Sequence, residues 1–391
     1  MILIKKILSP NWKYGVRSLY LVILVSFMLI GYYHLNIGFK MSSDSYTYSE
    51  WADNLIKLDF NLFSYYFQNT FINPNFIYTI PVLLIALSKY FFGEAWQYAF
   101  MILNLILVFS SLILFSKSLI LLKVRPLIIC LSMPLLVLSV DLLTWPRYIL
   151  SDMIFSFMII MTVYLIIKGI VKKKFYCLPI FFMIILMFLS RPTSIPFIFA
   201  IIAFVIISKF QVNYSPKYII LFIFLLSIFT PLIFAMLYQL MNVYLIDNAQ
   251  AVFLIEMVET GMIIHDRPET WIDTPKTFVD LVYLYFLRFI FFFKPYAESY
   301  SMIHIILNSL QTLIIFMSIN LWLFLKANFN SIHKTITLIL MISFSVAAFH
   351  SFTLIDYDWR YRFPIILPLI IIFPISIEIF LRKISDKIFK F

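Results

Sequence analysis

Charged residues and glycine are scarce in this sequence of 391 residues. Only 13% of the residues are Asp, Glu, Lys or Arg, while 63% are hydrophobic. A soluble domain has roughly 25% charged and about 45–50% apolar residues, so the composition excludes an ordinary soluble protein. With 6 glycines and no Walker-type or dinucleotide-type glycine loop, the sequence also argues against an ATP-driven transporter. The two cysteines, Cys130 and Cys177, lack the C-x-x-C spacing of a zinc or redox site.

The sequence contains long runs of apolar residues instead of charged ones. Several runs approach the length of about 20 residues that an α-helix needs to cross a bilayer. The first run, residues 16–37, lacks the small-residue cleavage site of a removed signal peptide, so we expect it to remain as a helix. The sequence therefore predicts an all-α polytopic membrane protein that forms one domain over residues 1–391.

The net charge of +11 is concentrated in clusters between the apolar runs, which does not favour a nucleic-acid partner. The clusters are Lys5, Lys6, Lys13 and Arg17; Lys117, Lys123 and Arg125; Lys168 and 172–174; Lys209 and Lys217; Lys326 and Lys334; Arg382, Lys383, Lys387 and Lys390. Loops rich in lysine and arginine stay on the cytoplasmic side of a membrane. The clusters therefore predict that both termini are cytoplasmic and that these residues set orientation rather than carry chemistry.

All clusters fall on one side only if segment 76–92 lies along the outer interface as an amphipathic helix and does not cross. The predicted spans are then 16–37, 95–115, 126–143, 149–167, 175–189, 195–208, 218–240, 302–325, 335–352 and 364–381, ten in all. They leave two large outer loops, 38–94 and 241–300, and the second contains another interfacial helix at 281–293. This gives a bundle of about ten transmembrane helices with an interfacial helix in each large outer loop.

The remaining charges gather at the predicted outer ends of the spans. They are Asp44, Arg147, Asp152, Arg191, His265, Asp266, Arg267, Lys294, Glu298, Asp356, Asp358, Arg360 and Arg362. Charged groups near membrane depth usually face a cavity or a partner, so we expect a shared outer cavity. Each group also has a simpler explanation: Arg147 and Asp152 anchor a span at the headgroups, Arg191 occupies a turn, and Asp44 caps a helix.

A cavity that contains arginines and a carboxylate suits one kind of chemistry. Guanidinium groups bind phosphate through two parallel hydrogen bonds, and a phosphate at this depth belongs to a lipid headgroup. A nearby carboxylate is suited to act as general base on an acceptor hydroxyl or amine. Together they indicate transfer of a sugar from a polyprenyl-phosphate carrier.

Four stretches carry a family resemblance: "SSDSYTYSEWA" around Asp44, "NPNFIYTIPVLLIALSKYFFGE", "RYILSD" from Arg147 to Asp152, and "DWRYRFP" with Arg360. In this order they resemble the multi-pass GT-C glycosyltransferases, such as protein O-mannosyltransferases and the aminoarabinose transferase that modifies lipid A. The resemblance covers nearly the whole chain and supports the non-crossing segment at 76–92.

The resemblance implies that Asp44 is the catalytic base, that Arg147 and Arg360 contact the carrier phosphate, and that the anomeric centre is inverted. Many members have a second acid, linked to metal or acceptor binding, after the loop aspartate, whereas Ser45 stands there in this chain. We therefore assign no metal ligand and no cofactor.

The other residues of the outer cavity complete the predicted site. We place Arg191, Lys294 and Arg362 with the phosphate-binding group, and Asp152, His265, Asp266 and Asp358 on the acceptor side.

The predicted partners are a polyprenyl-phosphate-linked sugar, a glycan, lipid or protein acceptor, and the bilayer, with the site on the outer face of a bacterial cytoplasmic membrane. Two alternatives stay open. A lipid-linked glycan flippase predicts charged or broken helices at mid-membrane. An O-antigen-type polymerase predicts that two lipid-linked glycans are held together.

Overall fold

The computed structural model describes residues 13–66, 74–174, 176–209, 278–296, 300–325, 330–352 and 359–388. Within these ranges the secondary structure is helical, apart from one isolated backbone bridge between Lys40 and Tyr148. The α-helices are α2 (Lys13–Ile37), α3 (Ser43–Lys57), α4 (Leu62–Tyr66), α5 (Thr79–Phe92), α6 (Trp96–Leu121), α7 (Pro126–Val137), α8 (Val140–Thr144), α9 (Asp152–Lys172), α10 (Cys177–Phe188), α11 (Ile195–Lys209), α14 (Phe278–Phe292), α15 (Met302–Leu325), α16 (Asn330–Phe352) and α17 (Phe363–Ile388). Short 3-10 turns include η1 (Pro74–Tyr78), η3 (Trp145–Arg147), η4 (Pro192–Ser194) and η7 (Trp359–Tyr361).

Six segments of the described residues are long and apolar enough to cross a membrane, and a seventh is added if the bent pair α7–α8 counts as one span. The all-α, multi-pass membrane class is confirmed, but the count of ten spans is not. Predicted spans 175–189 and 195–208 appear as the short apolar helices α10 and α11. Predicted span 218–240 lies outside the described residues.

Exposed side chains agree with a lipid environment. Helix α2 buries Leu19, Ile23 and Ile30 against the protein, while its opposite face leaves Tyr32 70% and Met28 62% exposed. A soluble helix would place polar residues on such a face. Because lipid tails are as apolar as these side chains, a helix with both faces apolar is stable at the edge of a membrane bundle.

The chain divides into two compact units. Unit 1 comprises residues Met1–Ile195, Ser301–Ile336 and Phe363–Phe391, and unit 2 comprises Pro196–Tyr300 and Thr337–Arg362. Each is described separately below. The prediction that residues 1–391 form a single domain stays a prediction.

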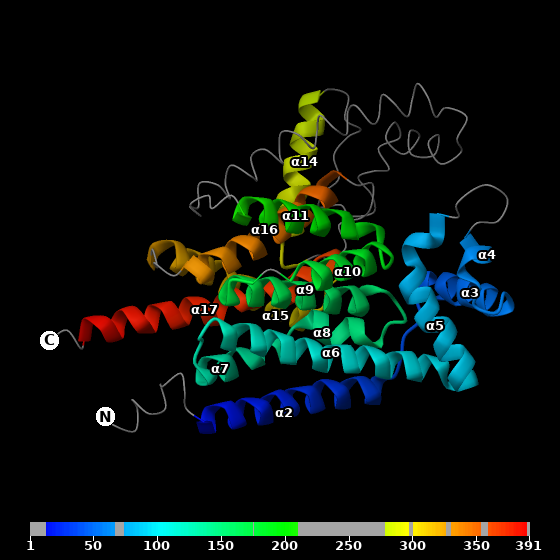
Figure 1. The fold of residues 1–391 in the computed structure, drawn as a ribbon, viewed down its shortest axis with the longest axis horizontal. Coiled ribbons are helices and arrows are strands. Elements are labelled where there is room, and N and C mark those ends of the chain that lie inside the picture. Colours follow the sequence, from blue (N-terminus) through cyan, green and yellow to red (C-terminus); the bar gives the residue numbers. More distant parts are fainter. Residues whose placement is uncertain are drawn as a thin grey trace. The chain divides into compact units, whose positions relative to one another are not determined.

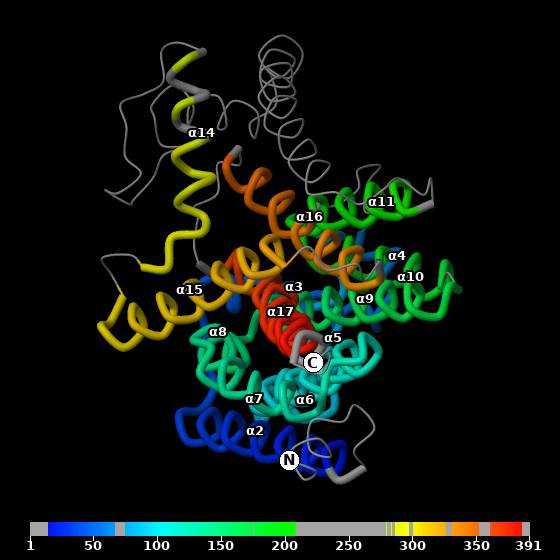
Figure 2. Tube along the Cα trace, turned by 90° about the vertical axis from the view of Figure 1, so that its left-hand side faces the viewer, coloured from blue at the N-terminus to red at the C-terminus, as the bar shows by residue number. Residues whose placement is uncertain are grey.

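Helix α17 lies at the centre of unit 1. It packs against α6, α7, α9 and α15, and Figure 2 shows it surrounded by them in the end-on view. Its side chains are buried on several faces, including Ile365, Ile370 and Ile375, none of which is exposed. A helix that is apolar all round belongs in the interior of a bundle. Helix α2 covers α7 and α6 on the outside of this arrangement (Figure 1).

Two breaks shape the helices around this core. Gly93, with φ +52° and ψ −125°, ends α5 before α6 begins at Trp96, and the lack of a Cβ makes this conformation accessible. Figure 1 shows α5 at a steep angle to α6, which agrees with the expected helix after "NPNF" that ends in Phe-Gly. Residues Asn75–Leu121 together form one apolar segment of 47 residues. The prediction that α5 lies along the membrane surface without crossing it stays a prediction. The second break, at residues 138–139, bends predicted span 126–143 by 54°.

Candidate functional site

The loop that follows α2, predicted to be the first outer loop, is fixed at its start to the segment that carries Arg147. Helix α2 ends where Gly38 N–H donates to the carbonyl oxygen of His34 (2.8 Å). Directly after it, Lys40 N–H donates to the carbonyl oxygen of Arg147 (2.8 Å), and Ile149 N–H donates to the carbonyl oxygen of Lys40 (3.2 Å). These two hydrogen bonds form the bridge between Lys40 and Tyr148, so loops far apart in sequence lie side by side.

Asn104 on α6 holds the other side of the same segment. Its buried Nδ2 donates to the carbonyl oxygens of Pro146 and Tyr148, both at 3.1 Å. The segment therefore lies between the end of α2 and the first half of α6.

One nitrogen of the Arg147 guanidinium makes no hydrogen bond within the described residues. This nitrogen, Nε, is buried. A buried guanidinium nitrogen without an acceptor is costly, so this group is suited to an incoming anion.

Asp44 lies in the first turn of α3 but does not cap that helix. The cap is Ser42: its Oγ accepts from Ser45 N–H at 3.3 Å, while Ser42 N–H donates to Ser45 Oγ at 3.0 Å. This is a capping box with serine at both positions. The alternative that Asp44 is the N-cap residue is therefore wrong: the half-buried Asp44 lies two residues after the cap, within the first turn of α3. Ser45 itself is fully buried in this box.

Chain geometry keeps Asp44 near the Arg147 segment. Asp44 is four positions after Lys40, and four residues of extended chain span at most about 14 Å. The structure thus brings the loop of Asp44 and the segment of Arg147 to one end of unit 1.

Asp152 and Arg191 form an ion pair that the sequence did not predict. The Arg191 Nη1 donates to Asp152 Oδ1, and the two side chains are 5% and 1% exposed. Asp152 begins α9, and Arg191 precedes η4. Close by, Ile80 N–H donates to the carbonyl oxygen of Leu189 (3.0 Å), which ties the start of α5 to the end of α10. Arg191 therefore has a carboxylate partner, whereas the sequence grouped Asp152 with Arg147.

Two phenol groups, those of Tyr65 and Tyr66, also lie in the loop that follows α2. Burial raises the pKa of Tyr65 to about 12, and the neighbouring Tyr66 and Glu50 act in the same direction. Burial raises the pKa of Tyr66 as well. Both phenols therefore keep their protons at neutral pH, and the buried Tyr66 hydroxyl has no hydrogen-bond partner within the described residues.

Three of the predicted phosphate-binding residues belong to unit 2. Arg362 donates from Nη1 to the carbonyl oxygen of Lys294. The Lys294 ammonium lies 4.4 Å from the ring centroid of Tyr296 and 4.7 Å from that of Phe291, at cation–π distance. Arg360 is half-buried in η7. Predicted residues His265, Asp266 and Asp358 lie outside the described residues.

Two buried polar residues were not singled out from the sequence. His350 in unit 2 is 1% exposed and lies between two rings, with centroids 5.8 Å from Phe292 and 4.6 Å from Tyr361. Glu378 in unit 1 is fully buried in α17. An ionisable residue within an apolar span is itself a signal of a specific role, and both positions carry that signal.

The part of the chain that the structure describes holds no group of three His, Cys, Asp or Glu side chains arranged as metal ligands. The apolar helices and this arrangement define the class as an all-α polytopic membrane protein. No family model, no curated protein and no solved structure matches the chain.

Proposed function

We propose that this protein is a membrane glycosyltransferase of the GT-C type. It moves a sugar from a polyprenyl-phosphate-linked donor to a glycan, lipid or protein acceptor at the outer face of a bacterial cytoplasmic membrane, with inversion at the anomeric carbon. The observation that supports this best is the Lys40–Tyr148 bridge, because it keeps the loop of the candidate base Asp44 beside the segment of Arg147.

In the proposed reaction, Asp44 accepts the proton of the acceptor hydroxyl or amine as that atom attacks the anomeric carbon. The bond between the anomeric carbon and the carrier phosphate oxygen breaks, and the electron pair leaves with the phosphate. Arg147 stabilises this developing negative charge. Its buried Nε, without an acceptor among the described residues, supports that role.

The other predicted residues take different parts in the proposal. Arg191, paired with Asp152, positions the start of α9 rather than binding phosphate directly. Arg360, Arg362 and Lys294 remain proposed phosphate ligands, with His265, Asp266 and Asp358 on the acceptor side.

Binding of undecaprenyl phosphate to the purified protein tests the proposal without knowledge of the sugar. We expect saturable binding that weakens about 10- to 100-fold in Arg147→Ala, since a hydrogen bond to a charged group contributes about 1.5–3 kcal/mol. Asp44→Asn should bind the carrier as the wild type does, because the base acts on the acceptor. Arg17→Ala is the matched control, because Arg17 is an exposed arginine near the start of α2.

Equal weakening in Arg147→Ala and Arg17→Ala would contradict the phosphate site. Absence of saturable binding would favour the flippase alternative. If purified protein lengthens a lipid-linked glycan instead of adding one sugar, the polymerase alternative is correct.

A further inference from the structure

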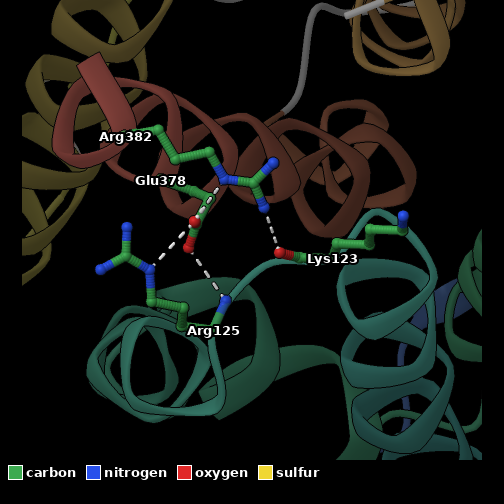
Figure 3. Close-up of polar contacts among 4 residues, drawn as sticks. All are labelled: Lys123, Arg125, Glu378 and Arg382. Atoms are coloured by element: carbon green, nitrogen blue, oxygen red, sulfur yellow. Dashed lines mark hydrogen bonds and ion pairs between the residues drawn. The ribbon is translucent and has the colours of Figure 1, made fainter. Parts of the chain in front are cut away.

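A second group of buried charges lies at the other end of unit 1 (Figure 3). Glu378 of α17 accepts three hydrogen bonds: from Arg125 Nε (3.0 Å), from Arg125 N–H (3.0 Å) and from Arg382 Nε (2.7 Å). Arg382 also donates from Nη2 to the carbonyl oxygen of Lys123. Asn104, which holds the Arg147 segment, lies 17 residues before the end of α6 at Leu121, which is about 26 Å at 1.5 Å per residue and separates the two groups.

Of the guanidinium nitrogens of Arg125, only Nε donates a hydrogen bond to the Glu378 carboxylate. Figure 3 shows both terminal nitrogens of Arg125 pointing away from Glu378. They have no hydrogen-bond partner within the described residues, although the residue is only 8% exposed. The two terminal nitrogens of a guanidinium fit two oxygens of one phosphate. Glu378 therefore fixes the orientation of the Arg125 guanidinium, and the fork formed by its two terminal nitrogens points away from the carboxylate.

Positive charge exceeds negative charge around this fork. Exposed Lys123 and Lys383 flank it on the α6–α7 turn and on α17, and Glu378 is the carboxylate that joins the two helices there. Lys123 adopts the left-handed conformation with φ +61°, where glycine is the less strained residue. A buried, oriented arginine with exposed lysines at the ends of apolar helices is the arrangement expected for a group at the depth of lipid headgroups.

We propose that Arg125, with Lys123 and Lys383 around it, binds the phosphate of an anionic phospholipid. The lipid tails would lie along the exposed apolar side chains of α7, such as Leu127 and Leu131, and the site would be independent of the sugar-transfer site proposed above. Glu378 acts here as a positioning residue, since it holds Arg125 and does not contact the lipid.

Native mass spectrometry of the full-length detergent-solubilised protein, titrated with phosphatidylglycerol or phosphatidylcholine, tests this site. We expect phosphatidylglycerol to bind at least about tenfold more tightly than phosphatidylcholine, because only the former has a net negative headgroup. The double variant Lys123→Ala/Lys383→Ala should lose most of this preference while remaining folded, since both side chains are exposed. Arg125→Lys should also lose it, because lysine replaces the fork with a point charge.

The control is Lys57→Ala, which removes one exposed positive charge from α3. Its lipid preference should equal that of the wild type. Equal affinity for the two lipids, or the same loss in Lys57→Ala, would overturn the proposal. Displacement of phosphatidylglycerol by millimolar inorganic phosphate would show that the fork binds a soluble anion and would overturn the assignment to a lipid. Undecaprenyl phosphate binding that is lost in Arg147→Ala but kept in Lys123→Ala/Lys383→Ala would separate this site from the first.

Discussion

At the scale of single residues, the structure separates two roles that the sequence had combined in Asp44. A loop aspartate at the start of a helix is typical of both a cap and a general base. Because Ser42 and Ser45 satisfy the first backbone N–H groups of α3 by themselves, the capping role does not require Asp44. Stability and activity should therefore respond to different residues of this loop.

We expect Ser42→Ala to lower the free energy of unfolding by about 1 kcal/mol, because it removes the N-cap acceptor of α3. Asp44→Asn keeps the size of the side chain and removes one charge from the first turn of α3, a change of about 0.3–1 kcal/mol in the free energy of unfolding, while abolishing sugar transfer. Unfolding in mixed micelles and a transfer assay measure the two effects. The reverse pattern would show that Asp44 is structural and not the base.

The Asp152–Arg191 pair gives a second prediction at this scale. Removing one partner leaves an uncompensated buried charge, so Asp152→Ala and Arg191→Ala should each cost about 3–5 kcal/mol. The double variant should cost clearly less than both losses added together. Unfolding free energies of the four proteins complete the cycle, and additive losses would mean that the two side chains act independently.

The sequence did not predict which charged side chains of the site pair with each other. Arg147 and Asp152 are five residues apart and were grouped for that reason, whereas the carboxylate faces Arg191, 39 residues further along the chain. Likewise Glu378 and Arg125 are 253 residues apart. Sequence spacing specifies neighbours within one helix, but contacts between helices depend on packing that periodicity does not encode.

At the scale of helices, the length of the apolar runs predicted where the helices lie in the sequence, but it did not predict where a helix is bent or interrupted. Predicted span 302–325 coincides with α15, and the turn at Gly93 follows from the glycine itself. The bend after Val137 was missed because the run 126–143 is apolar on both sides of it. Hydropathy alone does not distinguish a straight helix from a bent one. Predicted spans 175–189 and 195–208 correspond to the 12-residue α10 and the 15-residue α11. Both fall short of the about 20 residues of a crossing helix because the apolar runs themselves are short.

Asn104 provides a prediction for the element that carries Arg147. Asn104→Leu leaves the carbonyl oxygens of Pro146 and Tyr148 without their donor, at a cost of about 1–3 kcal/mol for each unsatisfied group. The 145–149 segment should then loosen, and the amide of Ile149 should exchange faster with deuterium. In Asn320→Leu, the control, an exposed amide that bonds only to Phe316 of its own helix is removed. Unchanged exchange at Ile149 would contradict the role of Asn104.

At the scale of the whole molecule, composition predicted the class and charge distribution predicted an orientation. The class is confirmed by apolar helices, whereas the orientation stays a prediction because no membrane is part of the structure. Within unit 1, the Arg147 segment is held by Asn104 in the first half of α6, whereas the Lys123–Arg382 group lies just beyond the end of α6 at Leu121. The positive-inside rule then assigns the lysine-rich end to the cytoplasm.

Cysteine labelling tests this orientation in a background where Cys130 and Cys177 are replaced by serine. A membrane-impermeant maleimide should label Ser43→Cys in intact cells, and Lys383→Cys only after the membrane is permeabilised. Both positions are exposed, so access depends on the side of the membrane. Lys117→Cys serves as a second cytoplasmic reporter. Labelling of position 383 before position 43 would reverse the topology and place Asp44 inside.

The Glu378 contact also bears on how the protein is made. The carboxylate that accepts the Arg125 N–H at the start of α7 lies 253 residues further along the chain. Since translation proceeds from the N-terminus, α6 and α7 enter the membrane long before their partner on α17 exists. The Arg125 N–H and guanidinium therefore lack their carboxylate partner until α17 inserts at the centre of unit 1. Assembly of the core is thus a late event of biogenesis, and α17 is the helix that completes it.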